Sequence, residues 1–370
     1  MDLASQYRKI RKEALEEIKK VCDSQHYILG KNVAALESEI AAYSGAKYAI
    51  GVASGTDAIL IALMAAGVKA GDKVVTTPFT FFATAGSISR IGAIPVFVDI
   101  DPETYNIDPT ALEALLKKSS KGVKAIIPVH LYGQCADMDR LMKIARKYKL
   151  AVIEDAAQSI GAGYKGKRAG AIGHMGCLSF YPTKNLGCFG DGGMITTNDA
   201  KLAERSKMLR VHGSRVRYYH DEVGANSRLD EIQAAVLRVK LKRLDSWAAG
   251  REKNAKKYDG LFAKAAIKGV LSTPRISEGC TSVYNQYVVR VKKRDELRAH
   301  LATEGIGSEV YYPLPLHMQK CFKGLGYKKG AFPVSEKAAR EVLALPIYPE
   351  LTTAQIKHVV ATIAKFFEKA

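Results

Sequence analysis

Apolar and polar positions in the first two thirds of the chain follow two periods. Short apolar runs rich in β-branched residues, which are typical of buried strands, are followed by loops and then by stretches with the three-to-four-residue spacing of a helix. The predicted strands are 48–52, 73–77, 94–98, 125–129 and 151–154. Because these strands alternate with helical stretches such as 137–148, the pattern predicts an α/β fold with a mainly parallel sheet.

The pattern changes in the last third of the chain. One long helix, charged on one side, is predicted over 228–262, followed by a strand at 287–291 and helices at 294–304 and 353–367. A chain of 370 residues exceeds one ordinary core. We therefore predict a large domain over 1–245, which includes an N-terminal helical segment, and a small C-terminal α+β domain over 246–370.

Charge and cysteine content narrow the class of protein. The formal net charge of +19 favours anionic ligands, but the basic residues are spread along the whole chain and do not form a tail, so nucleic acid is a distant candidate partner. The six cysteines form no Cys-x-x-Cys pair, and neither a metal site nor a disulfide framework is expected. The longest apolar run, 58–68, is too short to span a bilayer, so we expect a cytoplasmic, unprocessed protein without a membrane partner.

Ligands of an open α/β sheet bind where strands end and helices begin. The segment Ala53-Ser54-Gly55-Thr56-Asp57 lies at such a place, before an apolar helix over 58–66. Gly55 and Thr56 would leave backbone N–H groups at a helix N-terminus open to a phosphate. An ordinary N-cap by Ser54 or Thr56 is the alternative.

A second candidate segment is Glu154-Asp155-Ala156-Ala157-Gln158, at the end of the last predicted strand. A carboxylate at this place can keep the nitrogen of a pyridine ring protonated, and the protonated ring accepts the electrons of a carbanion. Gln158, three positions on, can donate a hydrogen bond to the ring's phenolic oxygen. Alternatively, Asp155 only caps the next segment.

A third segment carries Lys184 in a loop bounded by glycines, before Gly190-Asp191-Gly192-Gly193. A lysine that reaches into a pocket is desolvated, which lowers its pKa and makes its amine nucleophilic. Ser179 would add a hydroxyl for a phosphate. Most lysines in so basic a chain are solvated surface residues, so Lys184 stands out only because the Gly55 turn and Asp155 precede it in a workable order.

The fourth segment is Gly224-Ala225-Asn226-Ser227-Arg228, just before the long predicted helix. Asn226 can donate an amide hydrogen to a phosphate, and Arg228 can hold a negative group of a substrate. A helix cap by Asn226 or Ser227 is the alternative.

Together and in this order, the four segments resemble the DegT/StrS family of aminotransferases, which use pyridoxal 5′-phosphate (PLP) and act on nucleotide sugars. The resemblance extends from Ile28 to Pro346 and implies PLP fold type I, the fold of aspartate aminotransferase. It gives catalytic roles to Lys184, which would hold the cofactor as a Schiff base, and to Asp155. The other implied cofactor contacts are Gly55, Thr56, Phe81 stacked on the ring, Gln158, Ser179 and Asn226. Members lend this asparagine to a neighbouring subunit, which implies a homodimer with two shared active sites.

The resemblance also implies a reaction in two halves, in which L-glutamate converts PLP to pyridoxamine phosphate and a keto-sugar nucleotide then accepts the amine. Segments 131–137, 164–168 and 187–193 are most similar to aminotransferases that act on UDP-2-acetamido-2-deoxy-3-oxo-glucuronate in O-antigen or other surface polysaccharide pathways. A dTDP-keto-6-deoxy sugar is the alternative acceptor. The implied substrate contacts are Tyr181, Arg228, Tyr312 and His317, with Arg215 and Arg217 as candidates for the anionic groups; a structural role is equally expected for His317.

Two positions depart from the family's pattern, since Asp191 stands where members carry glutamate and Tyr181 where histidine is frequent. Both departures put the substrate in question more than the reaction.

Two rival interpretations remain. Gly161-x-Gly163-x-x-Gly166 matches a dinucleotide-binding fingerprint, but polar, glycine-rich sequence follows it where a helix is required, so a hairpin turn is predicted. A non-enzymatic regulator or nucleic-acid binder on the same fold would need the chemical residues to be lost, and they are intact.

Overall fold

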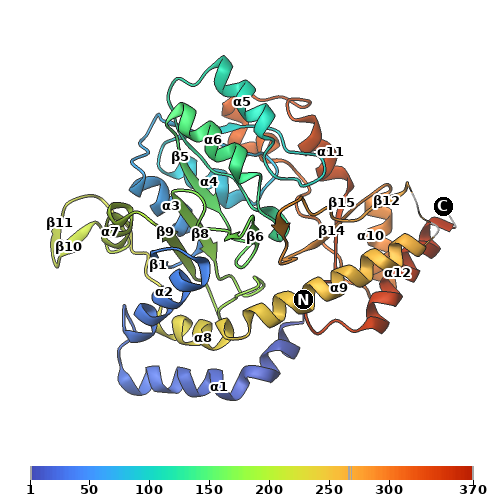
Figure 1. The fold of residues 1–370 in the computed structure, drawn as a ribbon, viewed down its shortest axis with the longest axis horizontal. Helices are drawn as coiled ribbons and strands as arrows, with labels where there is room; N and C mark the ends of the chain where they lie inside the picture. The colour runs from blue at the N-terminus through green and yellow to red at the C-terminus, as the bar shows by residue number, and fades with distance from the viewer. Residues whose placement is uncertain (1, 266, 268, 369–370) are drawn as a thin grey trace.

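A seven-stranded sheet lies at the centre of the N-terminal two thirds of the chain in the computed structural model, which describes residues 2–265, 267 and 269–368 (Figure 1). Its order is β1 (Tyr48–Val52), β9 (Gly193–Thr197), β8 (Met175–Ser179), β5 (Ala151–Asp155), β4 (Val123–Ile126), β2 (Lys73–Thr76) and β3 (Ile94–Phe97). Only β9 runs antiparallel to its neighbours. The predicted mainly parallel α/β fold is confirmed, although β4 begins two residues before the predicted strand.

Helices cover this sheet. They are α2 (Lys31–Ser44), α3 (Gly55–Ala65), α4 (Phe82–Arg90), α5 (Pro109–Lys118), α6 (Met138–Tyr148) and α7 (Ala200–Leu209), with the 3₁₀ turn η1 (Leu131–Gly133). α3 packs against β8, β9, α4 and α7. α3 is apolar all round, as suits a helix that is covered on several sides. This packing holds its N-terminus at the sheet edge.

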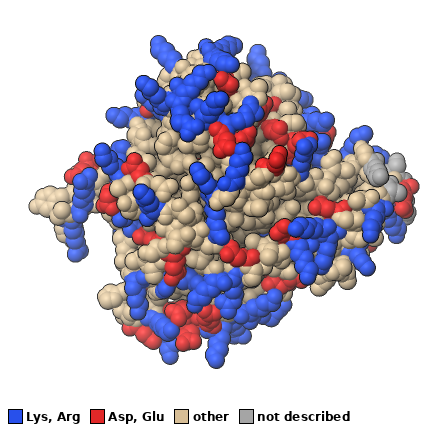
Figure 2. Space-filling view, in the orientation of Figure 1, with Lys and Arg blue, Asp and Glu red and all other residues tan. Residues whose placement is uncertain are grey.

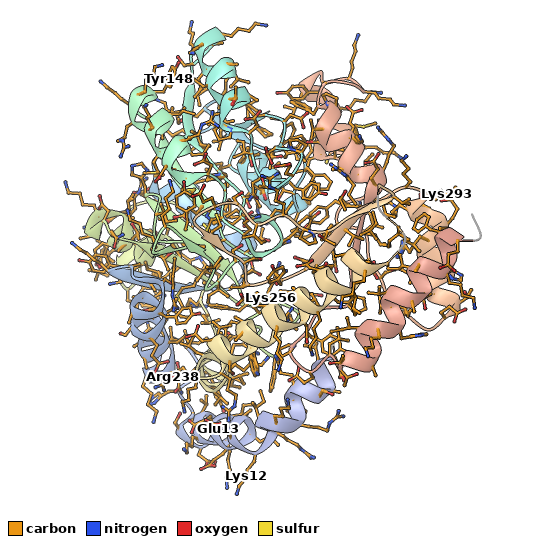
Figure 3. The ribbon with its side chains drawn as sticks, turned by 45° about the vertical axis from the view of Figure 1, so that its right-hand side comes forward. Lys12, Glu13, Tyr148, Arg238, Lys256 and Lys293 are labelled. Carbon is orange, nitrogen blue, oxygen red and sulfur yellow. The ribbon has the colours of Figure 1, made fainter. Side chains whose placement is uncertain are left out.

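The single long helix predicted over 228–262 is wrong, because the chain forms two helices, α8 (Glu231–Leu241) and α9 (Leu244–Lys264). No glycine or proline marks the break. Its cause is tertiary packing: α8 lies against α2 and α1 (Leu3–Ser24), whereas α9 packs on α12 (Thr353–Glu368). Figure 3 shows α1 beside α8, with Glu13 and Arg238 labelled on the two helices.

The C-terminal part forms its own core. An antiparallel sheet of β12 (Leu271–Ser272), β14 (Tyr287–Val291) and β15 (Val342–Leu345) packs with α9, α10 (Arg294–Thr303), α11 (Pro333–Glu341) and α12; two 3₁₀ turns, η2 (Leu316–Met318) and η3 (Lys320–Leu325), precede α11. Tyr258 and Tyr287 stack there with ring centroids 4.8 Å apart. The domain boundary at 245/246 stays a prediction; α9 crosses it, from Trp247 beside α1 to Phe262 in the C-terminal core.

Two small hairpins complete the fold. β6 (Gly163–Tyr164) and β7 (Lys167–Arg168) pair around Lys165 and Gly166, which both have positive φ as a type I′ turn requires, and β13 (Cys280–Thr281) joins β6. The predicted hairpin is therefore confirmed, and the dinucleotide fingerprint is wrong. β10 (Ser214–Val216) and β11 (Tyr219–His220) project from the left of the view in Figure 1. No helix in the described parts of the chain is long and apolar enough to cross a membrane.

Candidate active site

Asp155 ends β5, between β4 and β8 in the middle of the sheet, so its side chain lies at the carboxyl edge where parallel strands present ligand-binding residues. The carboxylate is 5% exposed; Oδ2 accepts a hydrogen bond from Thr84 Oγ1 at 2.7 Å and Oδ1 accepts one from the Ala157 N–H at 3.2 Å. Burial raises the pKa of Asp155, while these two bonds and the charge of Lys184 oppose the rise. These two bonds fix the orientation of the buried carboxylate.

Lys184 lies in the loop between β8 and β9, where its backbone N–H donates to the Tyr181 carbonyl at 2.8 Å. Burial lowers the pKa of the Lys184 amine to about 8, and the nearby Asp155 carboxylate works in the opposite direction. The fold therefore brings together an amine that is partly neutral near physiological pH and a buried acid from another strand. This pairing suits a nucleophilic lysine.

Gly55 begins α3 beside Ser179, the last residue of β8. A Cβ at Gly55 would lie 2.6 Å from the Ser179 Cβ, so only glycine allows the two segments to approach so closely. Ser54 Oγ accepts from the Asp57 N–H at 3.1 Å, and so the N-cap alternative is confirmed for Ser54. The cap, the helix N-terminus and the Ser179 hydroxyl form a cradle of the kind that holds a phosphate.

The segment before α8 reaches this cradle. Ser227 Oγ donates to Asp57 Oδ2 at 2.8 Å and accepts from the Ala53 N–H at 3.2 Å, which ties the segment to the start of α3. Asn226 is exposed and Arg228 half-buried. The cap interpretation of Asn226 and Ser227 is wrong, because Asp230 occupies the N-cap position of α8.

Gln158, Phe81 and Tyr312 converge on the same edge of the sheet. Gln158 Nε2 donates to the Tyr312 hydroxyl at 3.1 Å, and its Oε1 accepts from the Tyr132 N–H at 2.8 Å. The Phe81 ring, 58% exposed, lies 6.2 Å from the Tyr312 ring. Burial and the nearby Asp155 raise the pKa of Tyr312, so its hydroxyl stays protonated. A segment of the C-terminal part thus reaches Gln158 and lies near Asp155.

The remaining predicted substrate residues divide into exposed and buried ones. Tyr181 is 54% exposed, and Arg215 lies on the projecting hairpin with an ion pair to Asp221 at 3.3 Å. Arg217 packs over the ring of its neighbour Tyr218. His317 is buried, and its Nε2 lies 3.1 Å from Glu336 Oε1, so its ring has a structural partner.

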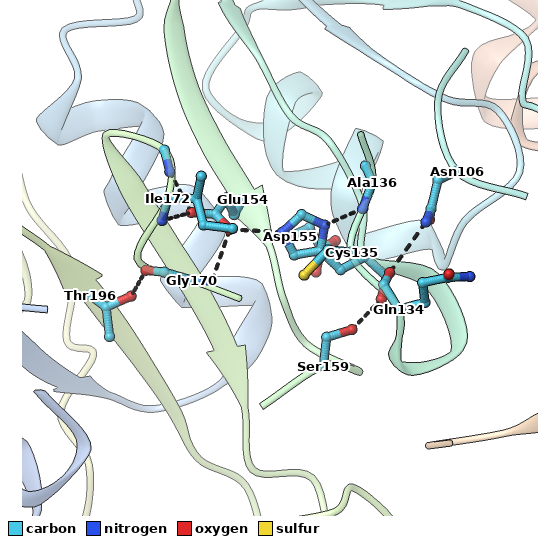
Figure 4. A network of polar contacts seen from close by, with 12 residues as sticks. Asn106, Gln134, Cys135, Ala136, Glu154, Asp155, Ser159, Gly170, Ile172 and Thr196 are labelled. Atoms are coloured by element: carbon cyan, nitrogen blue, oxygen red, sulfur yellow. Dashed lines mark hydrogen bonds and ion pairs between the residues drawn. The ribbon is translucent and has the colours of Figure 1, made fainter. Parts of the chain in front are cut away.

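Sequence reasoning missed a buried network behind Asp155, drawn in Figure 4. Glu154 is fully buried; it bonds His130 Nε2 at 2.8 Å and accepts from the N–H groups of Gly170, Ile172 and Gly173. His130 Nδ1 accepts from the Ala136 N–H, which places the proton of a neutral ring on Nε2. The adjacent Glu154-Asp155 pair was the available signal, because neighbouring side chains on a strand face opposite ways.

The donor set fits PLP: a cradle closed to any Cβ, a desolvated lysine and a buried acid lie at one sheet edge. Figure 2 shows Lys and Arg spread over the visible face with Asp and Glu between them, and no single basic stripe on that face.

Comparisons with known proteins agree with this geometry. The model of the DegT/DnrJ/EryC1/StrS aminotransferase family matches residues 8–364. A "Pleiotropic regulatory protein" of Geobacillus stearothermophilus is 54% identical, covering 99% of this chain and 98% of the relative. A UDP-2-acetamido-2-deoxy-3-oxo-D-glucuronate aminotransferase of Pseudomonas aeruginosa is 46% identical, covering 98% of each. A dTDP-3-amino-3,4,6-trideoxy-alpha-D-glucose transaminase of Streptomyces venezuelae is 42% identical, covering 100% and 96%.

Among solved structures, S. venezuelae DesV in complex with a ketimine intermediate superposes with a TM-score of 0.95 at 41% identity, covering 100% of this chain and 98% of DesV.

Proposed function

Because the chain belongs to the DegT/DnrJ/EryC1/StrS aminotransferase family, and is by that membership a PLP-dependent sugar aminotransferase, we propose that it moves the amino group of L-glutamate to the 3-keto group of UDP-2-acetamido-2-deoxy-3-oxo-D-glucuronate. The family resemblance, fold type, enzyme class and cofactor predicted from sequence are confirmed. The acceptor, the donor, the homodimer and the residue roles are proposals.

One observation carries the proposed chemistry: the desolvated Lys184 amine and the buried Asp155 carboxylate lie together beside the Gly55–Ser179 cradle. Bound PLP supplies a pyridinium ring that takes up electrons when a substrate C–H bond breaks. Asp155 keeps the ring nitrogen protonated. Lys184 holds the cofactor through its Nζ and then carries the proton between substrate carbon and cofactor.

The other residues would bind and orient. Ser179 and the first N–H groups of α3 receive the phosphate, and the exposed Phe81 ring offers a face for stacking. Tyr312, held by Gln158, excludes water from the acid–lysine pair. The exposed Tyr181 and half-buried Arg228 are proposed substrate contacts.

The acceptor is supported by the Pseudomonas relative, whose name specifies that sugar. A dTDP-linked keto sugar stays the second candidate, because the Streptomyces relative names such a sugar at 42% identity. A pathway of O-antigen or other surface polysaccharide synthesis in the cytoplasm follows from the first acceptor.

The experiment incubates the purified protein with PLP, L-glutamate and a panel of UDP- and dTDP-keto sugars, and measures 2-oxoglutarate and amino-sugar product. We expect the UDP-3-keto uronate to react with the highest kcat/KM, and the Lys184→Ala variant to be inactive while the exposed-site control Lys242→Ala keeps parental activity. Exclusive use of dTDP-4-keto-6-deoxy sugars would overturn the uronate but not the aminotransferase. Normal turnover by Lys184→Ala would overturn the role of Lys184.

The name of the Geobacillus relative makes a regulatory role worth testing in the same preparation. If DNA binds this chain only through non-specific charge attraction, it dissociates in moderate salt while the protein keeps its cofactor. Retention of DNA at that salt would support the regulator.

A further inference from the structure

Lys240 is a buried lysine that the proposed chemistry does not use. Its side chain lies on α8, is 3% exposed, and takes part in no ion pair with any described residue. Its Nζ donates to the carbonyl of Gly187 and lies 5.2 Å from the centre of the Phe189 ring. Burial lowers the pKa of the Lys240 amine to about 8, because burying a cation without a carboxylate is costly. Its contact with the main chain of the Lys184 loop must therefore be worth that cost.

The loop that carries Lys184 is tightly folded. The Phe180 carbonyl accepts from the Cys188 N–H at 2.8 Å and from its thiol at 2.9 Å, closing residues 180–188 into one turn. A Cβ at Gly187 would lie 2.3 Å from the Pro182 carbonyl oxygen. The backbone of Gly187 therefore lies closely against that of Pro182, two residues before Lys184.

A second residue of α8 holds the same loop. Gln233 Oε1 accepts from the Phe189 N–H at 2.8 Å, and Gln233 Nε2 donates to the Phe189 carbonyl at 3.4 Å. Gln233 and Lys240 are seven residues apart, two helical turns, and thus share one face of α8. That helix is anchored independently of the loop, against α1 and α2.

We propose that Lys240 and Gln233 are positioning residues. Together they fix the backbone of Gly187 and Phe189 to α8, and so they hold Lys184 in the position from which its amine reaches the cofactor. This inference rests on the proposed role of Lys184. It explains the buried cation, because an ammonium donates more strongly than an amide to a carbonyl that must not move.

The test compares Lys240→Met, which keeps chain length and loses the donor, with Lys242→Met, which removes an exposed lysine of the same region whose partner is Glu13. Hydrogen exchange in cofactor-free protein is expected to be about ten-fold faster or more across 181–190 in Lys240→Met, and unchanged in Lys242→Met. With PLP bound, kcat falls on the order of ten-fold while both KM values stay within about two-fold, since the loss is one of geometry at the reacting amine. Lys240→Arg, which keeps a cationic donor, restores most of kcat.

Gln233→Leu keeps the proposal testable if Lys240→Met does not fold, because it removes the other half of the clamp and is expected to quicken exchange in the same segment. Parental exchange over 181–190 in both variants would overturn the proposal, as would a faster exchange spread evenly over the whole chain. The exchange measurement needs no turnover, so its failure is distinct from a failure of Lys184→Ala to abolish activity.

Discussion

At the scale of single residues, the close approach of Gly55 and Ser179 makes the sharpest prediction. Gly55→Ala places a methyl group 2.6 Å from the Ser179 Cβ, so the start of α3 or the end of β8 must move. We expect PLP affinity to fall about ten-fold or more, because both halves of the phosphate cradle shift. Titration of cofactor-free protein with PLP measures it.

The matched control is Gly260→Ala, within α9, where an added Cβ meets no heavy atom within 4 Å. It should keep parental PLP affinity and unfold at slightly higher temperature, since alanine favours a helix by about 0.5–1 kcal/mol. Equal PLP affinity in Gly55→Ala and Gly260→Ala would contradict the cradle.

A second prediction at this scale concerns pH. Because only the neutral amine attacks an aldehyde, the rate at which cofactor-free protein captures PLP should rise with pH and level off above about 8, where the pKa of Lys184 lies. The Asp155 carboxylate raises that pKa, so Asp155→Asn should move the midpoint to lower pH. Stopped-flow absorbance over a range of pH measures both; a midpoint near 10.5, the ordinary lysine value, would refute the desolvated amine.

At the scale of elements, Glu154 joins β5 to the 130–136 turn and to the loop before β8. Its fully buried carboxylate accepts hydrogen bonds from His130 and from three backbone N–H groups. In Glu154→Gln the side-chain NH₂ group would face some of these N–H donors, and neither partner could accept. We expect a loss of about 2 kcal/mol or more in the free energy of unfolding. Urea unfolding of cofactor-free protein measures it.

The control for Glu154→Gln is the same substitution at Glu113 on α5. The Glu113 carboxylate is partly exposed and pairs with Lys117 and Lys147. Surface pairs of this kind contribute about 0–1 kcal/mol, so little change is expected. A Glu154→Gln protein as stable as Glu113→Gln would show that the network does not stabilise β5.

At the scale of the whole molecule, the proposed homodimer predicts that active sites are completed across subunits. Asn226 is exposed in one chain, although its neighbour Ser227 is tied to the cradle. Lys184→Ala and Asn226→Ala should each be nearly inactive, and their co-expressed mixture should recover about a quarter of parental activity, because half of the dimers then carry one intact site of two. Steady-state rates and sedimentation of the mixture measure this; no recovery in a dimeric mixture would argue for sites built within one chain.

The sequence by itself determined the elements and the chemistry that depend on local pattern. The five predicted strands followed from β-branched apolar runs, and the hairpin around Lys165 and Gly166 from the polar, glycine-rich sequence that follows it. Asp155 could be named because it ends a predicted strand, and Lys184 because the Gly55 turn and Asp155 precede it in a workable order. Nothing local in the sequence shows that the two side chains meet.

Only the tertiary structure decided what long-range packing controls. The break between α8 and α9 has no local signal. Leu241 and Leu244 pack on the core of the N-terminal part, whereas Tyr258 and Phe262, near the end of α9, pack in the C-terminal core. Three contacts of the site join residues that are 29 to 170 positions apart in the sequence. They are the pairing of Lys184 with Asp155, the Ser227–Asp57 bond and the contact of Lys240 with Gly187. Burial of these groups comes from the assembled fold, and burial is what changes the pKa of an amine or an acid.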